Sequence, residues 1–430
     1  MNLTKLQMVL IGGAIFLALI VLLVIVGILP GLKNEQLGKA KLTVWGFDEP
    51  KIFNEIGNKF IEENSGASIK YQQKTLSNFE EELLNAIARG ESPDVFVLPS
   101  TYLKKHLDKL SSAPALLITE REILQQYADS ASQFLTSKKE VYGIPLYGET
   151  LLVFWNKDLF TNEGIALAPK TWDEFLETSR RLTKKDSNGN ILISGSAMGR
   201  AKNIKYAPEI LTALFLQSGE KIINSSGKIV LGEGVLTGGT LLRPAESALR
   251  FFSEFSDPQK ASHSWSSSFQ EAKEMFISGK LAMYIGKSSE VPELIKRNPH
   301  LNFDVAHLPS LDGKRSTYGN LLAGVVPKAS KNYMASWAFV KFWARKDNSK
   351  IYSDLKNDVS PRRDLFSSYQ NDPRKSIFAE SVLSLDFWAN PDPIKTNKIF
   401  FDLIEEIATG QTTLRNAIEK ARAKIAEIKN

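Results

Sequence analysis

The sequence of 430 residues predicts an α/β fold built on a parallel sheet, preceded by one transmembrane helix. Two observations carry this prediction. Strand-like and helix-like segments alternate through residues 41–99, which is typical of a parallel sheet covered by helices. Ahead of them, residues 8–29 are uncharged and apolar, and this run of 22 residues exceeds the roughly 20 that cross a bilayer.

The alternation rests on side-chain periodicity. Three segments rich in apolar or β-branched residues are predicted as strands, at residues 41–46, 67–72 and 95–99. Helices with one apolar face are predicted between them. Because ligands bind at the carboxyl ends of strands in such sheets, the pattern singles out the residues at two strand ends. They are Trp45, Phe47 and Asp48 after the first strand, and Ser100 and Thr101 after the third. Trp45 could equally be a core residue, and Asp48 a helix cap.

Residues 142–182 carry the most informative pattern. A strand-like apolar run between residues 144 and 155 is interrupted at residues 147–149. Farther on, Thr171 is followed three residues later by Glu174, which predicts a capping box at the start of a helix. A strand, a loop and a helix in this order fit many α/β proteins, so periodicity alone does not identify the chain.

The short sequence motifs in this stretch are more specific than its periodicity. It contains G-I-P, W-N-K-D-L-F, P-K-T-W-D-E-F and L-T-K, in this order. Later segments read G-S-A-M-G, F-I-S-G-K-L-A-M-Y-I-G, V-A-H-L-P and S-P-R-R. This ordered set resembles the extracellular solute-binding proteins of sugar ABC transporters, the maltose-binding-protein-like family 1. The resemblance runs from about residue 41 to the C-terminus.

The resemblance implies a two-lobed periplasmic-binding-protein fold of type II with a hinge. Lobe 1 would comprise residues 41–144 and 326–366, and lobe 2 would comprise residues 150–318 and 370–430. The chain would cross between the lobes near residues 144–153, 318–326 and 360–370.

The resemblance also implies a ligand cleft between the lobes. The ligand-binding residues that it suggests are Trp45, Asp48, Ser100, Glu149, Arg200, Trp265, Tyr284, Asn320 and Trp388. Aromatic faces can stack on the C–H face of a pyranose while a few polar groups fix its hydroxyls. Residues 337–343, in contrast, are predicted to form a core-facing helix.

The front end is predicted as a short tail (residues 1–7), a membrane anchor (8–30) and a linker (31–40). A cleaved signal peptide has an apolar region of about 7–15 residues and a small-residue cleavage site, and neither is found here. The chain has no cysteine, so no lipid-modified cysteine can follow the run. We therefore expect an uncleaved, single-pass anchor in the cell membrane. The flanking charges decide its orientation poorly, and the resemblance places the large domain outside the cytoplasm.

The sequence contains no motif for metal binding, cofactor binding or nucleic-acid binding. The four histidines are scattered, and neither a metal site nor a cofactor motif is predicted. The polar turn at residues 184–190 lacks the closing glutamate of a calcium loop. A net charge of +6 over this length gives no reason to expect nucleic-acid binding.

The sequence therefore predicts a monomeric binding protein, not an enzyme, that captures a carbohydrate and delivers it to an ABC transporter permease. One alternative is a receptor subunit that senses a ligand for a membrane signalling partner. Another is a cell-envelope glycosidase, in which Asp48 and Glu149 would be the two carboxylates.

Overall fold

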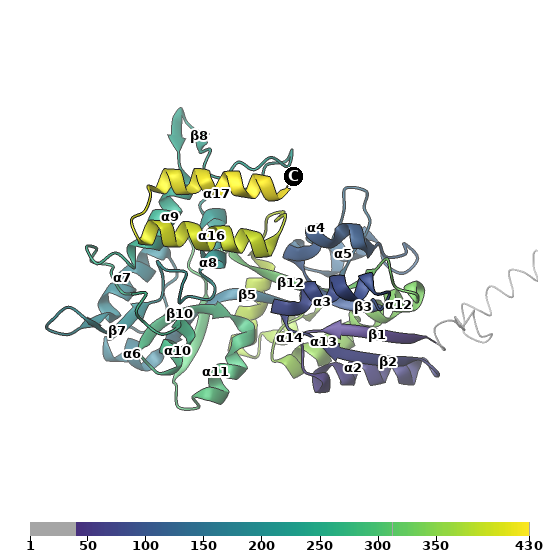
Figure 1. Ribbon diagram of the computed structural model, residues 1–430. Coiled ribbons are helices and arrows are strands. Elements are labelled where there is room, and N and C mark those ends of the chain that lie inside the picture. Colours follow the sequence, from purple (N-terminus) through teal and green to yellow (C-terminus); the bar gives the residue numbers. More distant parts are fainter. Residues whose placement is uncertain (1–39, 312, 430) are drawn as a thin grey trace, which may run out of the picture.

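The computed structural model describes residues 40–311 and 313–429, and Figure 1 shows two lobes joined by a pair of central strands. Lobe 1 lies on the right in this view and lobe 2 on the left. Within the described ranges, no helix is both long and apolar enough to cross a membrane. The predicted anchor at residues 8–30 lies outside the described residues.

The sheet of lobe 1 has the predicted order. β1 (Lys41–Gly46) pairs in parallel with β2 (Ser68–Gln73) on one side and with β3 (Val95–Pro99) on the other. The connections are α2 (Pro50–Glu63) and α3 (Leu76–Ala88), which confirms the strand–helix alternation. The carboxyl ends of β1 and β3 therefore meet at one edge of the sheet.

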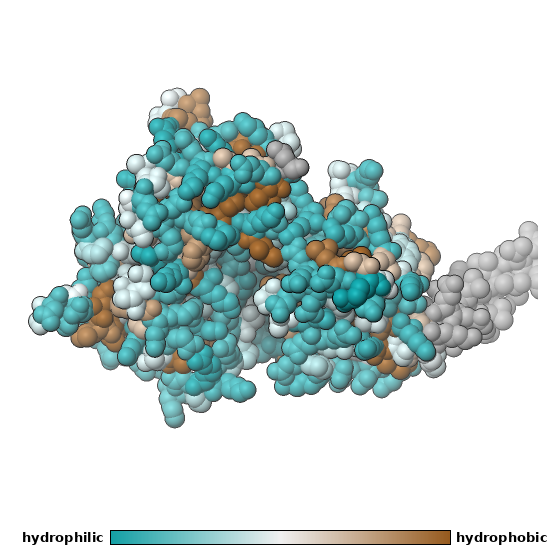
Figure 2. Space-filling model, viewed as in Figure 1, coloured by the Kyte–Doolittle hydropathy of each residue, from teal (hydrophilic) through white to brown (hydrophobic). Residues whose placement is uncertain are grey.

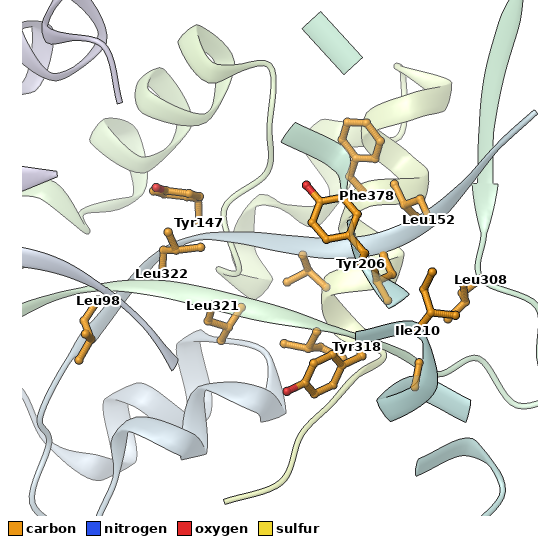
Figure 3. Packing of buried hydrophobic residues seen from close by; sticks show 14 of the residues in the cluster. Leu98, Tyr147, Leu152, Tyr206, Ile210, Leu308, Tyr318, Leu321, Leu322 and Phe378 are labelled. Atoms are coloured by element: carbon orange, nitrogen blue, oxygen red, sulfur yellow. The ribbon is translucent and has the colours of Figure 1, made fainter. Parts of the chain in front are cut away.

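Two antiparallel strands pass between the lobes, β5 (Ile144–Asn156) and β12 (Thr317–Pro327). The apolar run is interrupted at residues 147–149, but β5 is continuous there. These residues pair with Leu322, Leu321 and Asn320 of β12, and a partner strand overrides weak local strand propensity. Figure 3 shows the two strands side by side, with Tyr147 and Leu322 beside them. Through them a single sheet runs in the order β2-β1-β3-β12-β5-β10-β7-β6.

Lobe 2 completes this sheet with strands from the middle of the chain. They are β6 (Lys184–Lys185), β7 (Ile191–Ser196), β10 (Leu281–Lys287) and β11 (Phe303–His307). The helices of this part are α6 (Lys157–Asn162), α7 (Trp172–Leu182), α8 (Ala207–Gln217), α9 (Pro244–Glu254), α10 (Ala272–Ile277) and α11 (Val291–Arg297). The capping box predicted at the start of α7 is confirmed, with Thr171 and Glu174 bonding reciprocally.

The last quarter of the chain contributes to both lobes. α12 (Tyr333–Trp343) and α13 (Lys346–Lys356) pack against α2, whereas α15 (Pro373–Leu383) packs against β5 and β11. α16 (Pro393–Ala408) and α17 (Leu414–Lys429) pack against α8 and α9. The short elements are α4 (Leu103–His106), β4 (Leu110–Ser111), α5 (Glu120–Gln126), α14 (Phe366–Tyr369) and β13 (Leu385–Asp386), with β8 and β9 treated below.

Aromatic packing fixes α12 in lobe 1. Trp337, Phe339 and Trp343 are buried, as the core-facing prediction required. The ring of Trp343 meets that of Phe53 of α2 edge-on, with 5.2 Å between centroids. Edge-to-face pairs of this kind add about 0.5–1.5 kcal/mol to what area burial contributes.

A buried carboxylate lies beside the first crossing strand. Asp358 follows α13 and is 1% exposed, and its Oδ2 has no partner among the described residues. The carbonyl of the adjacent Val359 accepts the N–H of Gly148 on β5 at 3.3 Å. Burial raises the pKa of Asp358 to about 7, although the nearby Lys356 acts to lower it.

We expect Gly319→Ala to destabilise the crossing. A Cβ at this position of β12 would lie 2.1 Å from the carbonyl oxygen of Glu149 on β5, so the strands would have to separate. Forced contacts of this kind cost about 1–3 kcal/mol, which urea unfolding would measure. Leu116→Ala, at a side chain that is 88% exposed, is the control and should stay within about 0.5 kcal/mol of the wild type.

We also expect stability to fall as pH rises. The pKa of Asp358 is raised from its ordinary 3.8 to about 7, so between these values the folded chain holds a proton that the unfolded chain has released. The free energy of unfolding should decrease by up to about 1.4 kcal/mol per pH unit from this group. Asp358→Asn removes the titration, and its unfolding free energy should fall less between pH 5 and 7. Parallel curves for the two proteins would contradict this account.

Candidate ligand-binding site between the lobes

The crossing strands bring polar side chains together where the lobes meet. Glu149 of β5 stands opposite Asn320 of β12. The side-chain oxygen of Asn320 accepts hydrogen bonds from the hydroxyl of Thr101 at 2.7 Å and from its backbone N–H at 3.3 Å. The hydroxyl of Ser100 accepts the N–H of Leu321 at 3.3 Å. Three predicted ligand residues, Ser100, Glu149 and Asn320, therefore lie at one junction.

Glu149 is the open acceptor at this junction. Its side chain is partly exposed and forms no hydrogen bond or ion pair with the other described residues. Burial acts to lower the pKa values of Lys287 in lobe 2 and Lys356 in lobe 1, but carboxylates, Glu149 among them, raise both. The carboxylate of Glu149 thus lies within the electrostatic reach of a lysine from each lobe.

The wall contributed by lobe 2 is formed around Lys287, at the end of β10. Its ammonium group lies 3.0 Å from the carboxylate of Glu209 on α8 and 5.0 Å from the ring centre of Tyr206. Burial raises the pKa of Tyr206, and the charges of Glu290, Glu209 and Glu149 add to this effect. In Figure 3 the ring of Tyr206 lies beside the crossing strands.

The wall contributed by lobe 1 is formed around Asp48, which follows β1. One carboxylate oxygen pairs with Lys356 and the other accepts the hydroxyl of Tyr352, while the Asp48 carbonyl accepts the hydroxyl of Tyr71 at 2.7 Å. The ammonium group of Lys356 lies 3.9 Å from the ring centre of Tyr147. Asp48, predicted to contact ligand, is therefore occupied within its own lobe and positions Lys356.

Two ion pairs among the described residues join the lobes directly. In one, Lys375 of α15 lies 2.8 Å from Asp354 of α13. In the other, Lys105 of α4 lies 2.5 Å from Glu80 of α3 in its own lobe and 2.9 Å from Asp392, the N-cap of α16 in lobe 2. The charges of Glu80 and Asp392 also act on the neighbouring Tyr102. Burial raises its pKa to about 12, and the charges of Glu80, Asp392 and Glu209 add to this effect.

Two of the predicted aromatic residues pack away from this junction. Trp45 lines a groove of about 610 Å³ between β2 and α3, and the ammonium group of Lys74 lies 3.9 Å from its ring centre. Trp265 is fully buried in lobe 2, and its indole N–H donates to the side-chain oxygen of Asn203 at 3.0 Å. Neither ring offers a free face to a ligand between the lobes.

The remaining two aromatic residues are also buried. The hydroxyl of Tyr284 donates to Glu290 at 2.8 Å, behind Lys287 on the same strand. Trp388 follows β13 and lies beside Tyr318 of β12, close to the crossing. Trp388 comes two residues after Asp386, which pairs with Tyr318, and Tyr318 is two residues from Asn320.

Arg200 is held within lobe 2. Its guanidinium group lies 2.5 Å from Glu405 of α16, and the same carboxylate accepts the backbone N–H groups of Ala201 at 2.7 Å and Lys202 at 3.0 Å. Next to it, a cavity of about 260 Å³ opens between α8 and α16. Its lining residues are Ala201, Lys205, Pro208, Glu209, Asn397, Lys398 and Phe401. Through Glu209 this cavity adjoins the wall around Lys287.

Sequence reasoning missed Tyr102, Tyr206, Glu209, Lys287 and Lys356. The strand-end rule could have found two of them, because Tyr102 closely follows β3 and Lys287 ends β10. The other three lie on or beside helices, and nothing in their local sequence signals proximity to Glu149.

The junction therefore combines a free carboxylate, an amide, hydroxyls and two paired lysines. Such groups donate and accept hydrogen bonds with a ligand rich in hydroxyls. Among the described residues, no cluster of histidine and carboxylate side chains could hold a metal ion. The site is suited to binding between two lobes.

Comparisons with known proteins agree with this geometry. The family profile of the bacterial extracellular solute-binding proteins matches residues 46–350. The galactooligosaccharide-binding protein of Bacillus subtilis is 23% identical over 400 residues, covering 89% of this chain and 88% of that protein. A cyclo/maltodextrin-binding protein solved with maltotetraose superposes with a TM-score of 0.72 at 19% identity, over 90% of this chain and 96% of that one.

The sugar-binding protein MalE of Xanthomonas citri gives a TM-score of 0.74 at 20% identity, over 90% of this chain and 97% of that one. At this identity the likeness to solved structures establishes the two-lobed fold. The family profile covers well over half of the chain. The chain therefore belongs to the family of bacterial extracellular solute-binding proteins.

Proposed function

We propose that this protein captures a carbohydrate between its lobes outside the cytoplasm and delivers it to an ABC transporter permease. The observation that carries the proposal is the free carboxylate of Glu149 on a crossing strand, between a lysine of each lobe. The names of the relatives support a sugar as ligand, since they include binders of galactooligosaccharide and maltotriose.

The ligand contacts follow from the chemistry at the junction. Glu149 accepts hydrogen bonds from sugar hydroxyls, and the amide of Asn320 and the hydroxyl of Ser100 complete the floor. Asp48 and Arg200 act indirectly by holding the walls, as do the buried rings of Trp45, Trp265 and Tyr284. Of the four predicted aromatic residues, Trp388 is the one that we propose to stack on the sugar. The partly exposed Tyr102 offers another ring at the same edge.

Lobe closure would convert binding into a signal for the permease. The moving units are residues 41–144 with 326–366 and residues 150–318 with 370–430, and the crossings lie near 144–153, 318–326 and 360–370. The ligand favours closure only as far as it interacts better with the closed form. The ion pair of Lys105 with Asp392 adds a direct attraction between the lobes.

The predicted anchor, residues 8–30, would hold the protein in the membrane in which the permease resides. The protein acts by binding and not by turnover, since its relatives are named as binding proteins. We propose that it works as a monomer, as one ligand between two lobes of one chain requires no second copy.

Thermal unfolding of the full chain in detergent, against a panel of mono- and oligosaccharides, tests the proposed function. A ligand at 100 times its dissociation constant should add about 2.7 kcal/mol of stability. Glu149→Gln should weaken binding about ten- to hundredfold, because it replaces a charged acceptor of hydrogen bonds. Glu177→Gln, on the exposed face of α7, makes the same change and should leave affinity unaltered.

A panel without any stabilising sugar would count against carbohydrate capture and favour a sensor with a different ligand. Equal affinities of Glu149→Gln and the wild type would leave sugar binding intact but remove Glu149 from the site.

Small-angle scattering tests closure. The radius of gyration should decrease when the ligand found in the panel is added. Lys105→Met removes the ion pair with Asp392 but leaves the N-cap role of Asp392, so the ligand-free radius should increase and affinity should fall by up to about fivefold. Lys109→Met, which breaks an exposed pair with Asp108, is the matched control. Identical radii with and without ligand would refute closure.

A further inference from the structure

A short β-hairpin projects from lobe 2. It consists of β8 (Val235–Thr237) and β9 (Thr240–Leu242), which pair with each other and form a sheet of their own. Figure 1 shows it standing clear of the lobe above α17. The two residues of its turn, Gly238 and Gly239, have φ angles of 56° and 81°. Positive φ at both positions is the tight type I′ turn that suits the twist of a hairpin.

The hairpin exposes four large apolar side chains. Val235 is 39% exposed, Leu236 73%, Leu241 50% and Leu242 48%. Val235 pairs with Leu242 across the strands, and Leu236 pairs with Leu241. Because successive residues of a strand point to opposite faces, one apolar pair lies on each face of the hairpin. Figure 2 shows apolar surface at this projection.

The base of the hairpin is fixed by a buried carboxylate. Glu220 is 4% exposed, and its two oxygens accept the backbone N–H of Gly232 at 2.7 Å and that of Ala245 at 3.1 Å. These residues flank the hairpin on either side. Gly232 also lies against Ile418 of α17, where a Cβ would meet the side chain at 2.3 Å. The hairpin is therefore held in a defined position with its apolar side chains in water.

The helix beside the hairpin, α17, has a net positive charge, although Arg415 and Lys420 pair with Glu419 and Glu406. α17 carries five basic residues, Arg415, Lys420, Arg422, Lys424 and Lys429, against two acidic ones, Glu419 and Glu427, a net charge of +3. Two of the basic residues reach the segment that leads to the hairpin. Lys429 donates to the carbonyl of Gly227, and Arg422 lies 3.8 Å from Glu233.

We propose that the hairpin inserts its tip into the surface of an anionic lipid membrane. A protein groove would cover one face of the hairpin and leave the apolar pair on the other face in water, whereas a lipid phase surrounds both faces. The basic residues of α17 would be attracted to anionic headgroups. The outer edges of both strands carry unpaired backbone groups, so insertion stops at the depth of the headgroups. The inference rests on the proposed location at a membrane.

The absence of cysteine from the chain allows a direct test. Leu236→Cys and Leu241→Cys variants of the full chain are labelled with an environment-sensitive fluorophore. They are reconstituted in vesicles of phosphatidylcholine and phosphatidylglycerol that contain a brominated lipid. Both labels should shift to the blue and be quenched by the bromine atoms, and quenching should weaken in vesicles without phosphatidylglycerol.

The controls are Leu116→Cys in lobe 1 and Leu167→Cys in lobe 2, at side chains 88% and 67% exposed and outside the hairpin. Their labels should not be quenched. Adding Leu241→Ser to the Leu236→Cys variant should reduce quenching at 236, because it removes one member of the apolar pair.

Flotation of the vesicles separates this inference from the proposed anchor. If the chain floats with the vesicles but the hairpin labels are not quenched, the anchor stands and the hairpin proposal fails. Equal quenching at all four positions would also overturn it, as would protection of the labels only after a permease is added. A chain that does not float with the vesicles refutes both.

Discussion

The antiparallel pairing of β5 with β12 is the constraint on which the rest of the structure depends. It continues one sheet from lobe 1 into lobe 2. The approach is close enough that Gly319 has no room for a side chain against the carbonyl of Glu149. The same pairing sets Glu149 opposite Asn320. The groups that would touch a ligand are therefore carried by the strands about which the lobes would move, so binding and lobe movement act on the same few residues.

Charge pairing explains why Glu149 stays open. Each lobe neutralises its own buried lysine, Lys356 with Asp48 and Lys287 with Glu209. A buried lysine without a partner would cost several kcal/mol, so these pairs are fixed by the lobes themselves. Glu149 raises the pKa values of both lysines, but its own oxygens form no ion pair with them. A carboxylate with unused hydrogen-bond acceptors is thus available where a hydroxyl-rich ligand would bind.

Local signals predicted much of the fold and little of the site. The alternation in lobe 1 and the capping box of α7 were confirmed because periodicity and capping act over a few residues. The partner of Asp48 could not be predicted in this way, since Lys356 lies 308 residues farther along the chain. The position of the Trp45 ring in a groove of lobe 1 could not be predicted either. Neighbours from other segments decide which face of a strand is covered.

Attachment at two points would restrict how the lobes move. The described chain enters at β1 of lobe 1, whereas the hairpin belongs to lobe 2, on the far side of the crossing strands. An anchor before lobe 1 and a hairpin in the lipid surface would each hold one lobe. Closure must then shift one attachment relative to the other. Nine residues, 31–39, separate the predicted anchor from the described chain, and nine residues can span at most about 30 Å. A tether of this reach would let lobe 1 move relative to the membrane, so the hairpin could fix the orientation of lobe 2 while lobe 1 closes on the ligand.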